Sequence, residues 1–210
     1  MNGKQVPLVV IKRLPRYHRY LGELLKNNIT RISSTELSEK MGVTASQIRQ
    51  DLNFFGGFGQ QGYGYNVEML YECITSILGL DKGYKTVLIG AGNLGHALAN
   101  YAGFSNRGFE LVGIFDVDSQ KIGQPIAGLE VKHYSEIEKF IETEKPHIAI
   151  LAVPKTAVVE IAEKVVSCGI KALWNFAYVD LDLPSDVVVE NVHLSESLMT
   201  LSYRMTENKK

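Results

Sequence analysis

The glycine-rich stretch GAGNLGHAL, residues 90–98, constrains the fold more than any other part of the sequence. It follows a short apolar run, TVLI, and it opens a segment with helical character. In a strand–loop–helix unit, Gly90 allows a tight turn, Gly92 allows a phosphate to approach the backbone, and Gly95 allows the helix to pack against the sheet. The first turn of such a helix offers free N–H groups and a partial positive charge. The stretch therefore predicts a site for the pyrophosphate of a dinucleotide.

From residue 81 onward, strand-like and helical segments alternate. The strands are predicted near TVLIG, ELVGIFD, EVKHY, HIAILAVP, KALWNFA and VVVENV, and the helices begin near Asn93, Ser135, Thr156 and Ser195. Continuous apolar strands joined by helices are typical of a mostly parallel sheet that is covered on both faces. We therefore predict an α/β fold with a doubly wound, Rossmann-type parallel sheet over residues 81–192.

The rest of the dinucleotide site follows from its spacing. Asp116 lies 21 residues after Gly95, where a carboxylate would bind the adenosine ribose and repel a 2′-phosphate, so NADH and NAD+ are favoured. Ligands bind outside the carboxyl ends of parallel strands, which places the segments AVP and NFA beside the nicotinamide. The predicted cofactor-binding residues are Gly90, Gly92, Asn93, Leu94, Gly95, Asp116, Ala152, Val153, Pro154, Asn175 and Phe176. A tight turn without a ligand, or a coenzyme A site on a similar fold, remain alternatives.

The sequence carries no recognisable catalytic motif. No tyrosine is followed four residues later by lysine, and HExxH, GxSxG and GxxxxGK[ST] do not occur. The five histidines are scattered, and Cys73 and Cys168 are far apart without a CxxC pair, which argues against a metal site. We predict that the protein is not an enzyme and that it senses the nucleotide rather than consuming it. The alternative is an NAD-dependent oxidoreductase with a helical cap domain.

Residues 1–80 are basic and helical. They carry nine Lys and Arg against six Asp and Glu, whereas residues 81–210 carry thirteen against seventeen. A basic front on an acidic body suggests an anionic partner such as nucleic acid. The segment SSTELSEKMGVTASQIRQDLNFF predicts two short helices around a turn at Gly42–Val43, as in a helix-turn-helix.

The glycine- and aromatic-rich segment GGFGQQGYGYNV then resembles the wing of a winged helix. Gln and Asn side chains pair with adenine edges, Arg pairs with guanine or phosphate, and basic side chains position the duplex. The residues predicted to contact DNA are Lys12, Arg13, Arg16, Ser46, Gln47, Arg49, Gln50, Gln60 and Gln61. A helical bundle for protein contacts remains the alternative.

Residues 193–210 predict a C-terminal helix with an apolar stripe. Leu194, Leu198, Leu201 and Met205 recur at helical spacing, and such a stripe needs a surface on which to be buried. That surface is either the chain's own sheet or a second subunit, and a two-fold dimer would match two DNA half-sites.

Targeting signals are not evident. The longest apolar run, IAILAV, is far shorter than the roughly 20 residues of a membrane span. The amino terminus lacks the apolar region of a secretory leader. We expect a cytoplasmic protein with no membrane partner.

Taken in order, these segments resemble the redox-sensing transcriptional repressor Rex family over essentially the full chain. The stretches that carry the resemblance are RISSTELSEKMGVTASQIRQDLNFFGGFGQQGYGYNV, GAGNLGHALANYAGF, IFDVD, ILAVP, GIKALWNF and LSYRM. The resemblance implies a homodimer with a swapped C-terminal helix. It also implies binding to palindromic, AT-rich duplex DNA that NADH weakens and NAD+ permits.

The resemblance further implies a switch network of three residues. An arginine of the first helix, a tyrosine after the glycine loop and an acidic residue before the last helix correspond here to Arg19, Tyr101 and His193. His193 replaces the family's aspartate, and Tyr178 stands where the family has proline. Our hypothesis is that a hydrogen bond between Tyr101 and His193 persists, with weaker coupling or an added pH dependence.

Overall fold

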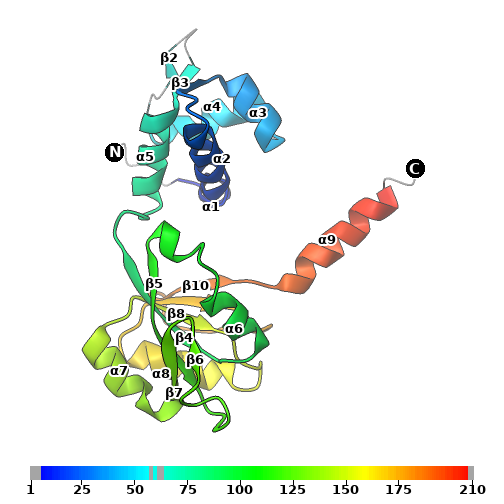
Figure 1. Cartoon of the computed structure of the whole chain (residues 1–210). Helices are drawn as coiled ribbons and strands as arrows, with labels where there is room; N and C mark the ends of the chain where they lie inside the picture. Colours follow the sequence, from blue (N-terminus) through cyan, green and yellow to red (C-terminus); the bar gives the residue numbers. More distant parts are fainter. Residues whose placement is uncertain (1–5, 57–58, 61–63, 208–210) are drawn as a thin grey trace. The chain divides into compact units, whose positions relative to one another are not determined.

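The computed structural model describes residues 6–56, 59–60 and 64–207. The chain divides into two compact units, Met1–Lys82 and Gly83–Lys210 (Figure 1). Within the described residues, no helix is both long enough and apolar enough to cross a bilayer.

The first unit is a small helical domain with a short sheet. Its elements are α1 (Leu8–Ile11), α2 (Leu14–Lys26), β1 (Arg31–Ile32), α3 (Ser34–Met41), α4 (Ala45–Asn53), β2 (Gly59–Gln60), β3 (Gly64–Asn66) and α5 (Val67–Ile77). The sheet is antiparallel in the order β1-β3-β2. The core is contributed by every helix from α2 to α5, including Tyr17, Leu37, Ile48 and Leu70, which are fully buried.

Local sequence signals set the helix–turn–helix geometry. Ser33 and Glu36 form a reciprocal capping box at the start of α3. Gly42 ends α3 in the left-handed region, at a φ of 63° that glycine adopts without strain. Thr44 accepts a hydrogen bond from the Gln47 N–H and so caps α4. The predicted turn therefore has a physical cause at each of its positions.

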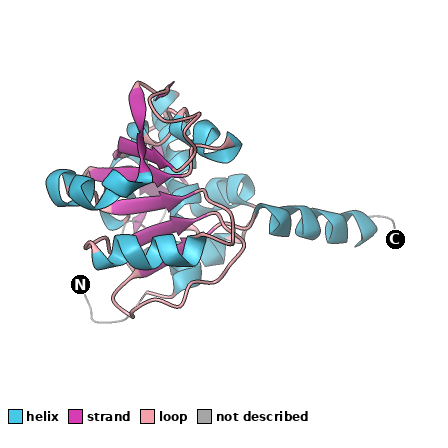
Figure 2. Ribbon diagram, turned by 90° about the horizontal axis from the view of Figure 1, so that it is seen from below, coloured by secondary structure: helices cyan, strands magenta, loops and turns pink. Residues whose placement is uncertain are grey.

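The second unit contains a seven-stranded sheet (Figure 2). Its strands are β4 (Tyr84–Ile89), β5 (Phe109–Asp116), β6 (Pro125–Ile126), β7 (Leu129–His133), β8 (Ile148–Leu151), β9 (Ala172–Asn175) and β10 (Val188–Asn191). Their spatial order is β10-β9-β8-β4-β5-β7-β6, and all neighbours are parallel except β6 and β7. Without β6, this is the 3-2-1-4-5-6 order of doubly wound dinucleotide-binding folds. The predicted parallel sheet is confirmed.

The hairpin that adds β6 is absent from the sequence prediction. Its two-residue turn consists of Ala127 and Gly128, with φ values of 51° and 81°. Two positive φ values are typical of a type I′ turn, which usually carries Asn or Asp at its first position. Ala127 is a poor signal for that conformation, so the hairpin leaves little trace in the sequence.

The helices cover the two faces of the sheet unequally. The helices that cover it are α6 (Asn93–Ala99), α7 (Ile137–Glu144) and α8 (Val158–Ser167), with short 3₁₀ turns η1 (Ser105–Arg107) and η2 (Tyr134–Glu136). The last helix of the unit is α9 (Leu194–Glu207). Helices α7 and α8 pack on one face, over side chains such as Val87, Phe115 and Leu151. On the other face α6 covers residues such as Leu88 and Ile150 (Figure 1).

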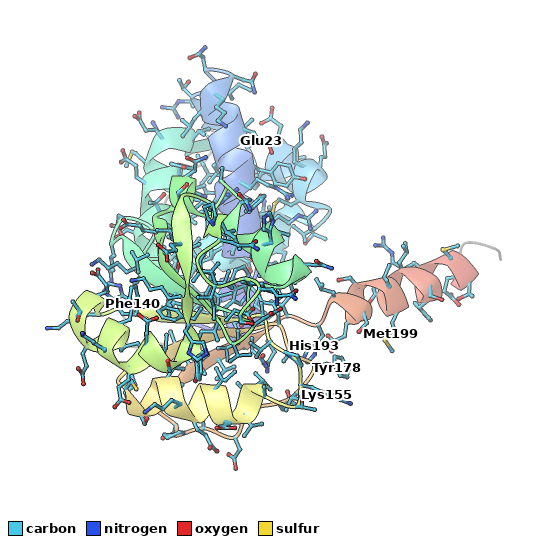
Figure 3. The ribbon with its side chains drawn as sticks, turned by 60° about the horizontal axis from the view of Figure 1, so that its bottom comes forward. Glu23, Phe140, Lys155, Tyr178, His193 and Met199 are labelled. Carbon is cyan, nitrogen blue, oxygen red and sulfur yellow. The ribbon has the colours of Figure 1, made fainter. Side chains whose placement is uncertain are left out.

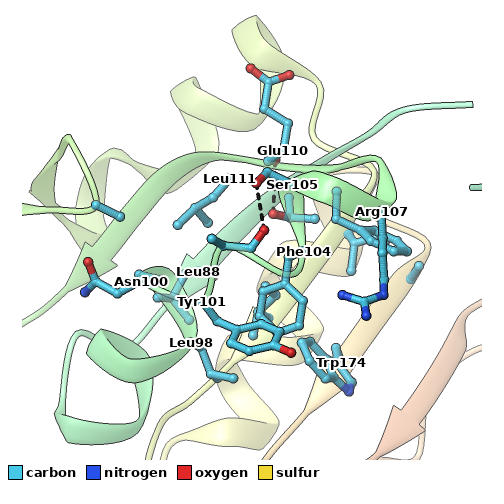
Figure 4. Close-up of a pocket in the computed structure, with 18 of the residues that line it drawn as sticks. Leu88, Leu98, Asn100, Tyr101, Phe104, Ser105, Arg107, Glu110, Leu111 and Trp174 are labelled. Atoms are coloured by element: carbon cyan, nitrogen blue, oxygen red, sulfur yellow. Dashed lines mark hydrogen bonds between the residues drawn. The ribbon is translucent and has the colours of Figure 1, made fainter. Parts of the chain in front are cut away.

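A hollow of about 800 Å³ remains on that second face (Figure 4). The described residues 176–187, between β9 and β10, contain no helix that could fill it. Its lining from the strands runs from Thr86, Ile148, Ala172 and Val188 to Leu88, Ile150, Trp174 and Glu190 further along the same four strands. Neither the last residues of these strands nor the glycines of the glycine loop line it.

Helix α9 does not bury its apolar stripe on its own chain. Leu194, Leu198, Leu201 and Met205 are 62%, 68%, 53% and 58% exposed, and in the described chain no residue of α9 is buried. The sequence analysis left two surfaces for this stripe, the chain's own sheet and a second subunit. The chain's own sheet does not cover it.

Candidate functional site

The glycine loop lies where β4 ends, between β5 and β8. Gly90 has a φ of 100°, and a Cβ there would overlap the backbone carbonyl of Ala152. A Cβ on Gly95 would overlap the carbonyl oxygen of Gly90. Both glycines are therefore required by the close approach of the protein's own backbone segments.

Gly92 differs from these two glycines. It has a φ of −72°, and a Cβ built on it would meet no protein atom within 4 Å. Neither backbone strain nor packing demands a glycine at this position. Space kept open beside the start of a helix suits a ligand that approaches the backbone closely, as a pyrophosphate does.

The first turn of α6 begins at the same place. Its N-cap is Gly92, which has no side chain to accept a hydrogen bond from the helix. The predicted contacts Asn93 and Leu94 are the first two residues of this turn, and Asn93 is exposed. Gly90, Gly92, Asn93, Leu94 and Gly95 thus form one continuous loop and helix start.

Asp116 ends β5 beside this loop and is only 8% exposed. Its carboxylate accepts hydrogen bonds from the N–H of Ala91, at 2.7 Å, and from that of Asp118, at 2.9 Å. Lys121 Nζ lies 3.3 Å from Oδ2. Burial alone would raise the pKa of Asp116, but these donors outweigh it and hold the pKa below the ordinary 3.8. The carboxylate is therefore ionised and ties the glycine loop to the neighbouring strand.

Sequence reasoning missed Lys121, since nothing in its spacing marks it as a partner of Asp116. Asp118 caps the next turn, because its side chain accepts a hydrogen bond from the Gln120 N–H at 3.0 Å.

The predicted nicotinamide side is built from the ends of β8 and β9. Ala152 and Val153 are half-buried and approach Gly90, whereas Pro154 is exposed. Phe176 packs against Trp174, with ring centroids 4.6 Å apart. The structure thus brings the ends of β4 and β8 together around apolar groups.

Asn175 has a different environment from the one predicted. Its side chain is fully buried and donates to the Val179 carbonyl and to Asn191 Oδ1. Its own Oδ1 accepts from the Ala177 N–H. These internal bonds shape the loop after β9, and the amide gives its hydrogen bonds to the protein.

The three predicted switch residues are divided between the two units. Arg19 is an exposed residue of α2 in the first unit. Tyr101, in the second unit, is 55% exposed and packs edge-on against Phe104. Tyr101 also lines the hollow on the open sheet face (Figure 4).

His193 follows β10 and contacts Glu196 and Tyr178 rather than Tyr101. Its Nδ1 lies 2.8 Å from Glu196 Oε1, and its ring centroid lies 4.6 Å from that of Tyr178 (Figure 3). Its Nε2 is buried and has no hydrogen-bond partner among the described residues. His193 and Tyr178, which the sequence interpretation marked as departures from the family pattern, are therefore neighbours in space.

The candidate DNA-reading surface is the outer face of α4. Ser46, Arg49 and Gln50 are exposed there, and Arg49 donates to Ser34 Oγ at 2.9 Å. Of the basic residues predicted near α2, Lys12 and Arg16 are exposed as well. These side chains are accessible to solvent.

Arg13 and Gln47 both bond to a buried carboxylate of the same domain. Arg13 forms two 2.7 Å hydrogen bonds with the fully buried Asp51, and Gln47 Nε2 donates to the same carboxylate at 2.9 Å. The sequence interpretation of Arg13 as a solvated phosphate contact overlooked Asp51, which lies 38 residues away. Of the predicted wing residues, Gln60 lies in β2, and Gln61 lies outside the described residues.

Among the described residues, no cluster of three or more His, Cys, Asp or Glu side chains could hold a metal ion. Cys73 and Cys168 are free thiols.

Family profiles match both units. Residues 5–53 match a family described as "Putative DNA-binding protein N-terminus", and residues 81–179 match one described as "CoA binding domain".

The chain is also similar to curated repressors over nearly its whole length. It is 60% identical to the redox-sensing transcriptional repressor Rex of Thermoanaerobacter pseudethanolicus, over 98% of this chain and 92% of that protein. It is 56% identical to the Rex repressor of Clostridioides difficile, over the full length of both.

Among solved structures, the Rex-family repressor RSP is similar in two bound states. RSP in complex with NAD+ and operator DNA matches with a TM-score of 0.92 and 60% identity, covering 98% of this chain and 95% of that one. RSP in complex with NADH matches with a TM-score of 0.91 and 57% identity, covering 98% and 97%. The predicted arrangement of an N-terminal DNA-binding domain and a C-terminal Rossmann-type domain is thereby confirmed.

Proposed function

The chain belongs to the Rex family of redox-sensing transcriptional repressors. We propose that it represses transcription by binding operator DNA, and that NADH weakens this binding whereas NAD+ permits it. The observation that carries this proposal is the match, over 98% of the chain, to RSP structures with NADH and with NAD+ and operator DNA. Residues 1–80 would bind DNA, residues 81–192 the nucleotide, and residues 193–210 a second subunit. A repressor acts on chromosomal DNA, so we place the protein in the cytoplasm.

The glycine loop supports nucleotide binding through features of this chain. Gly92 leaves open space at the start of α6, and the ionised Asp116 lies beside the same loop. A carboxylate there disfavours a 2′-phosphate, which supports NADH and NAD+ over their phosphorylated forms. Ala152, Val153 and Phe176 would surround the nicotinamide with apolar groups.

The nicotinamide ring supplies the redox difference that a sensor needs. The ring is cationic in NAD+ and neutral in NADH, and apolar surroundings disfavour an unpaired charge. A ligand moves a conformational equilibrium only when it binds the two conformations with different affinity. Ala152, Val153 and Phe176 carry no group that could transfer a proton, which agrees with a regulator rather than an enzyme.

For DNA recognition, we propose that α4 enters the major groove and presents Ser46, Arg49 and Gln50 to base edges. Lys12 and Arg16 would contact phosphates, which position the protein without specifying sequence. Glutamine pairs well with adenine, which agrees with an AT-rich operator.

We propose a homodimer in which α9 of each chain packs on the other. In the single chain, α9 exposes its apolar stripe while one sheet face keeps a largely apolar hollow of about 800 Å³. In a dimer, α9 of one chain would cover the hollow of the other, and the burial of both apolar surfaces would be favourable. A two-fold dimer would also match a palindromic operator.

The switch would then operate between subunits through Arg19, Tyr101 and His193. Glu196 adjoins His193 in this chain, so a carboxylate lies within 2.8 Å of the histidine at the start of α9. We propose that this pair, rather than a single aspartate, meets Arg19 and Tyr101 of the second subunit.

The test is fluorescence anisotropy on a labelled duplex that carries the RSP operator, titrated with NADH and then with NAD+ at fixed salt. We expect release by NADH and retained binding with NAD+. Tight binding that is indifferent to NADH would contradict the sensing role, and failure to prefer the operator over a scrambled duplex would contradict the DNA-reading role.

A further inference from the structure

Asp51 is the centre of a hydrogen-bond network that joins α4 to α2. Its side chain is fully buried. Arg13 Nε donates to Oδ2 and Arg13 Nη2 to Oδ1, both at 2.7 Å. The Tyr17 hydroxyl donates to Oδ2 at 2.9 Å, and Gln47 Nε2 donates to Oδ1 at 2.9 Å. The four donors come from three residues, which are Arg13 at the N-cap of α2, Tyr17 within α2 and Gln47 within α4.

The network leaves Asp51 ionised. A carboxylate that is withdrawn from water is costly unless charge and hydrogen bonds compensate it. Burial alone would raise the pKa of Asp51, but the hydrogen bonds from Arg13, Gln47 and Tyr17 outweigh it and keep the pKa below 3.8. The Arg13 guanidinium is correspondingly committed to Asp51 in a bidentate pair.

The same carboxylate fixes the side chain of Gln47. An ionised carboxylate only accepts hydrogen bonds, so the amide nitrogen of Gln47, not its oxygen, must face Asp51. The amide oxygen and the second N–H are left for another partner. These are the two groups that a glutamine uses to read an adenine edge.

Gln47 and Asp51 lie one helical turn apart on the same side of α4. Together with Gln50 and Asn53 they line one shallow hollow next to α1. Asp51 therefore lies behind the amide side chains of α4 rather than on an unrelated face.

We propose that Asp51 is a positioning residue for operator recognition, which holds the Gln47 amide in its base-reading orientation and fixes α4 on α2. Arg13 acts in this arrangement as the counter-ion of Asp51 and not as a phosphate contact. The inference rests on the proposed DNA-binding function and adds to it how the reading side chain is oriented.

The test compares Asp51→Asn, Gln47→Ala and the double variant in the full-length protein. Each is titrated against the RSP operator duplex, a set of operators with single base-pair changes, and a scrambled duplex. Asp51→Asn retains a polar side chain of the same size but removes the charge that orients Arg13 and Gln47.

We expect Asp51→Asn and Gln47→Ala each to weaken operator binding by about tenfold or more, the worth of one well-formed base contact. Both should lose discrimination at the same base pair, and the double variant should lose little more than either single one. Losses that multiply, losses at different base pairs, or an unchanged operator affinity for Asp51→Asn would overturn the proposal. If the wild-type protein fails to prefer the operator, the proposed function fails instead.

The role of Arg13 is tested by the salt dependence of binding, with Arg16→Gln as the matched variant on the same helix. Loss of a phosphate contact reduces the magnitude of the negative slope of log K against log salt by about one unit. We expect this for Arg16→Gln, whereas Arg13→Gln should weaken operator binding with the slope unchanged. If Arg13→Gln also reduces the magnitude of this slope, Arg13 contacts a phosphate, and that part of the proposal is overturned.

A variant that unfolds the domain is recognised by its loss of binding to the scrambled duplex. In that case Arg13→Lys provides the measurement, since it keeps the charge but loses the bidentate geometry. We then expect reduced discrimination at the Gln47-dependent base pair, and unchanged discrimination contradicts the proposal.

Discussion

At the scale of single residues, two buried carboxylates organise the two units. Asp51 joins α4 to α2, and Asp116 joins the glycine loop to the end of β5. Each has its pKa held below the ordinary value by hydrogen bonds that outweigh burial. A carboxylate of this kind stabilises the fold only while it is ionised, which makes its contribution dependent on pH.

The first prediction concerns the acid stability of the N-terminal unit. The folded-state pKa of Asp51 is depressed, so its contribution is present above about pH 4 and is lost as the pH falls through the folded pKa. Asp51→Asn should lower the free energy of unfolding at pH 7 by about 2 kcal/mol, the worth of hydrogen bonds to a charged group. It should also flatten the loss of stability on acidification. Hydrogen exchange of α2 and α4 between pH 7 and pH 3 measures both effects, and equal acid profiles for variant and wild type would contradict the assignment.

The second prediction concerns His193. Replacement by Asp supplies the anion that the Arg19 position would meet in related chains. We therefore expect the NADH-dependent change in operator affinity to grow by roughly fivefold or more, which is the lower range of allosteric couplings. The measurement is the operator dissociation constant with and without saturating NADH. Tyr178→Pro removes the ring packed on His193 without adding charge, so it separates the loss of that packing from the effect of the charge. An unchanged NADH response and pH profile in His193→Asp would show that His193 is not part of the switch.

At the scale of elements, loop conformations are set by a few residues with special backbone requirements. Gly42 closes the helix–turn–helix in the left-handed region, and Gly90 turns the end of β4 towards α6. Gly92 sits at the N-cap of α6 with space beside it. The glycine loop therefore contains glycines that the fold requires, and one, Gly92, that the fold does not require and that leaves space for a ligand.

The third prediction separates these roles. Gly92→Ala meets no protein atom, so the fold should persist while the added methyl blocks the pyrophosphate and weakens NADH binding by about a hundredfold. Gly95→Ala would overlap the Gly90 carbonyl, so both stability and NADH binding should fall. NADH fluorescence titration and thermal unfolding of the two variants check this. A Gly92→Ala protein that binds NADH normally would place the pyrophosphate elsewhere.

At the scale of the whole molecule, the chain leaves complementary apolar surfaces uncovered. One sheet face lacks a helix between β9 and β10, and α9 exposes its stripe. Exposure of either surface to water is unfavourable, because the free energy of burial is proportional to the apolar area removed from solvent. The proposed assembly with a second copy would bury both.

The fourth prediction tests this assembly. Leu198→Glu should raise the dimer dissociation constant by roughly a hundredfold, since burial of a leucine stabilises by about 2–3 kcal/mol and each 1.4 kcal/mol is a factor of ten. Thr200→Glu adds the same charge to α9 beside the stripe rather than in it, and should change association far less. Sedimentation velocity across protein concentrations measures both. Equal effects of the two substitutions would show that the stripe is not the interface.

The sequence by itself determined the features that depend on neighbouring residues. The turn at Gly42, the glycine loop and the parallel strands all follow from short-range chemistry, and each lies near its predicted place. The family resemblance also followed from these motifs, because their order along the chain is part of the pattern.

Only the tertiary structure decided which polar groups meet and which faces stay open. It paired Arg13 with Asp51 across 38 residues, buried Asn175 in its own loop, and set His193 against Tyr178. It also left one sheet face with a hollow. The physical reason is that helix caps and tight turns are formed by adjacent residues. The partner of a charged side chain, in contrast, depends on packing between elements that are distant in the chain, and no local pattern encodes it.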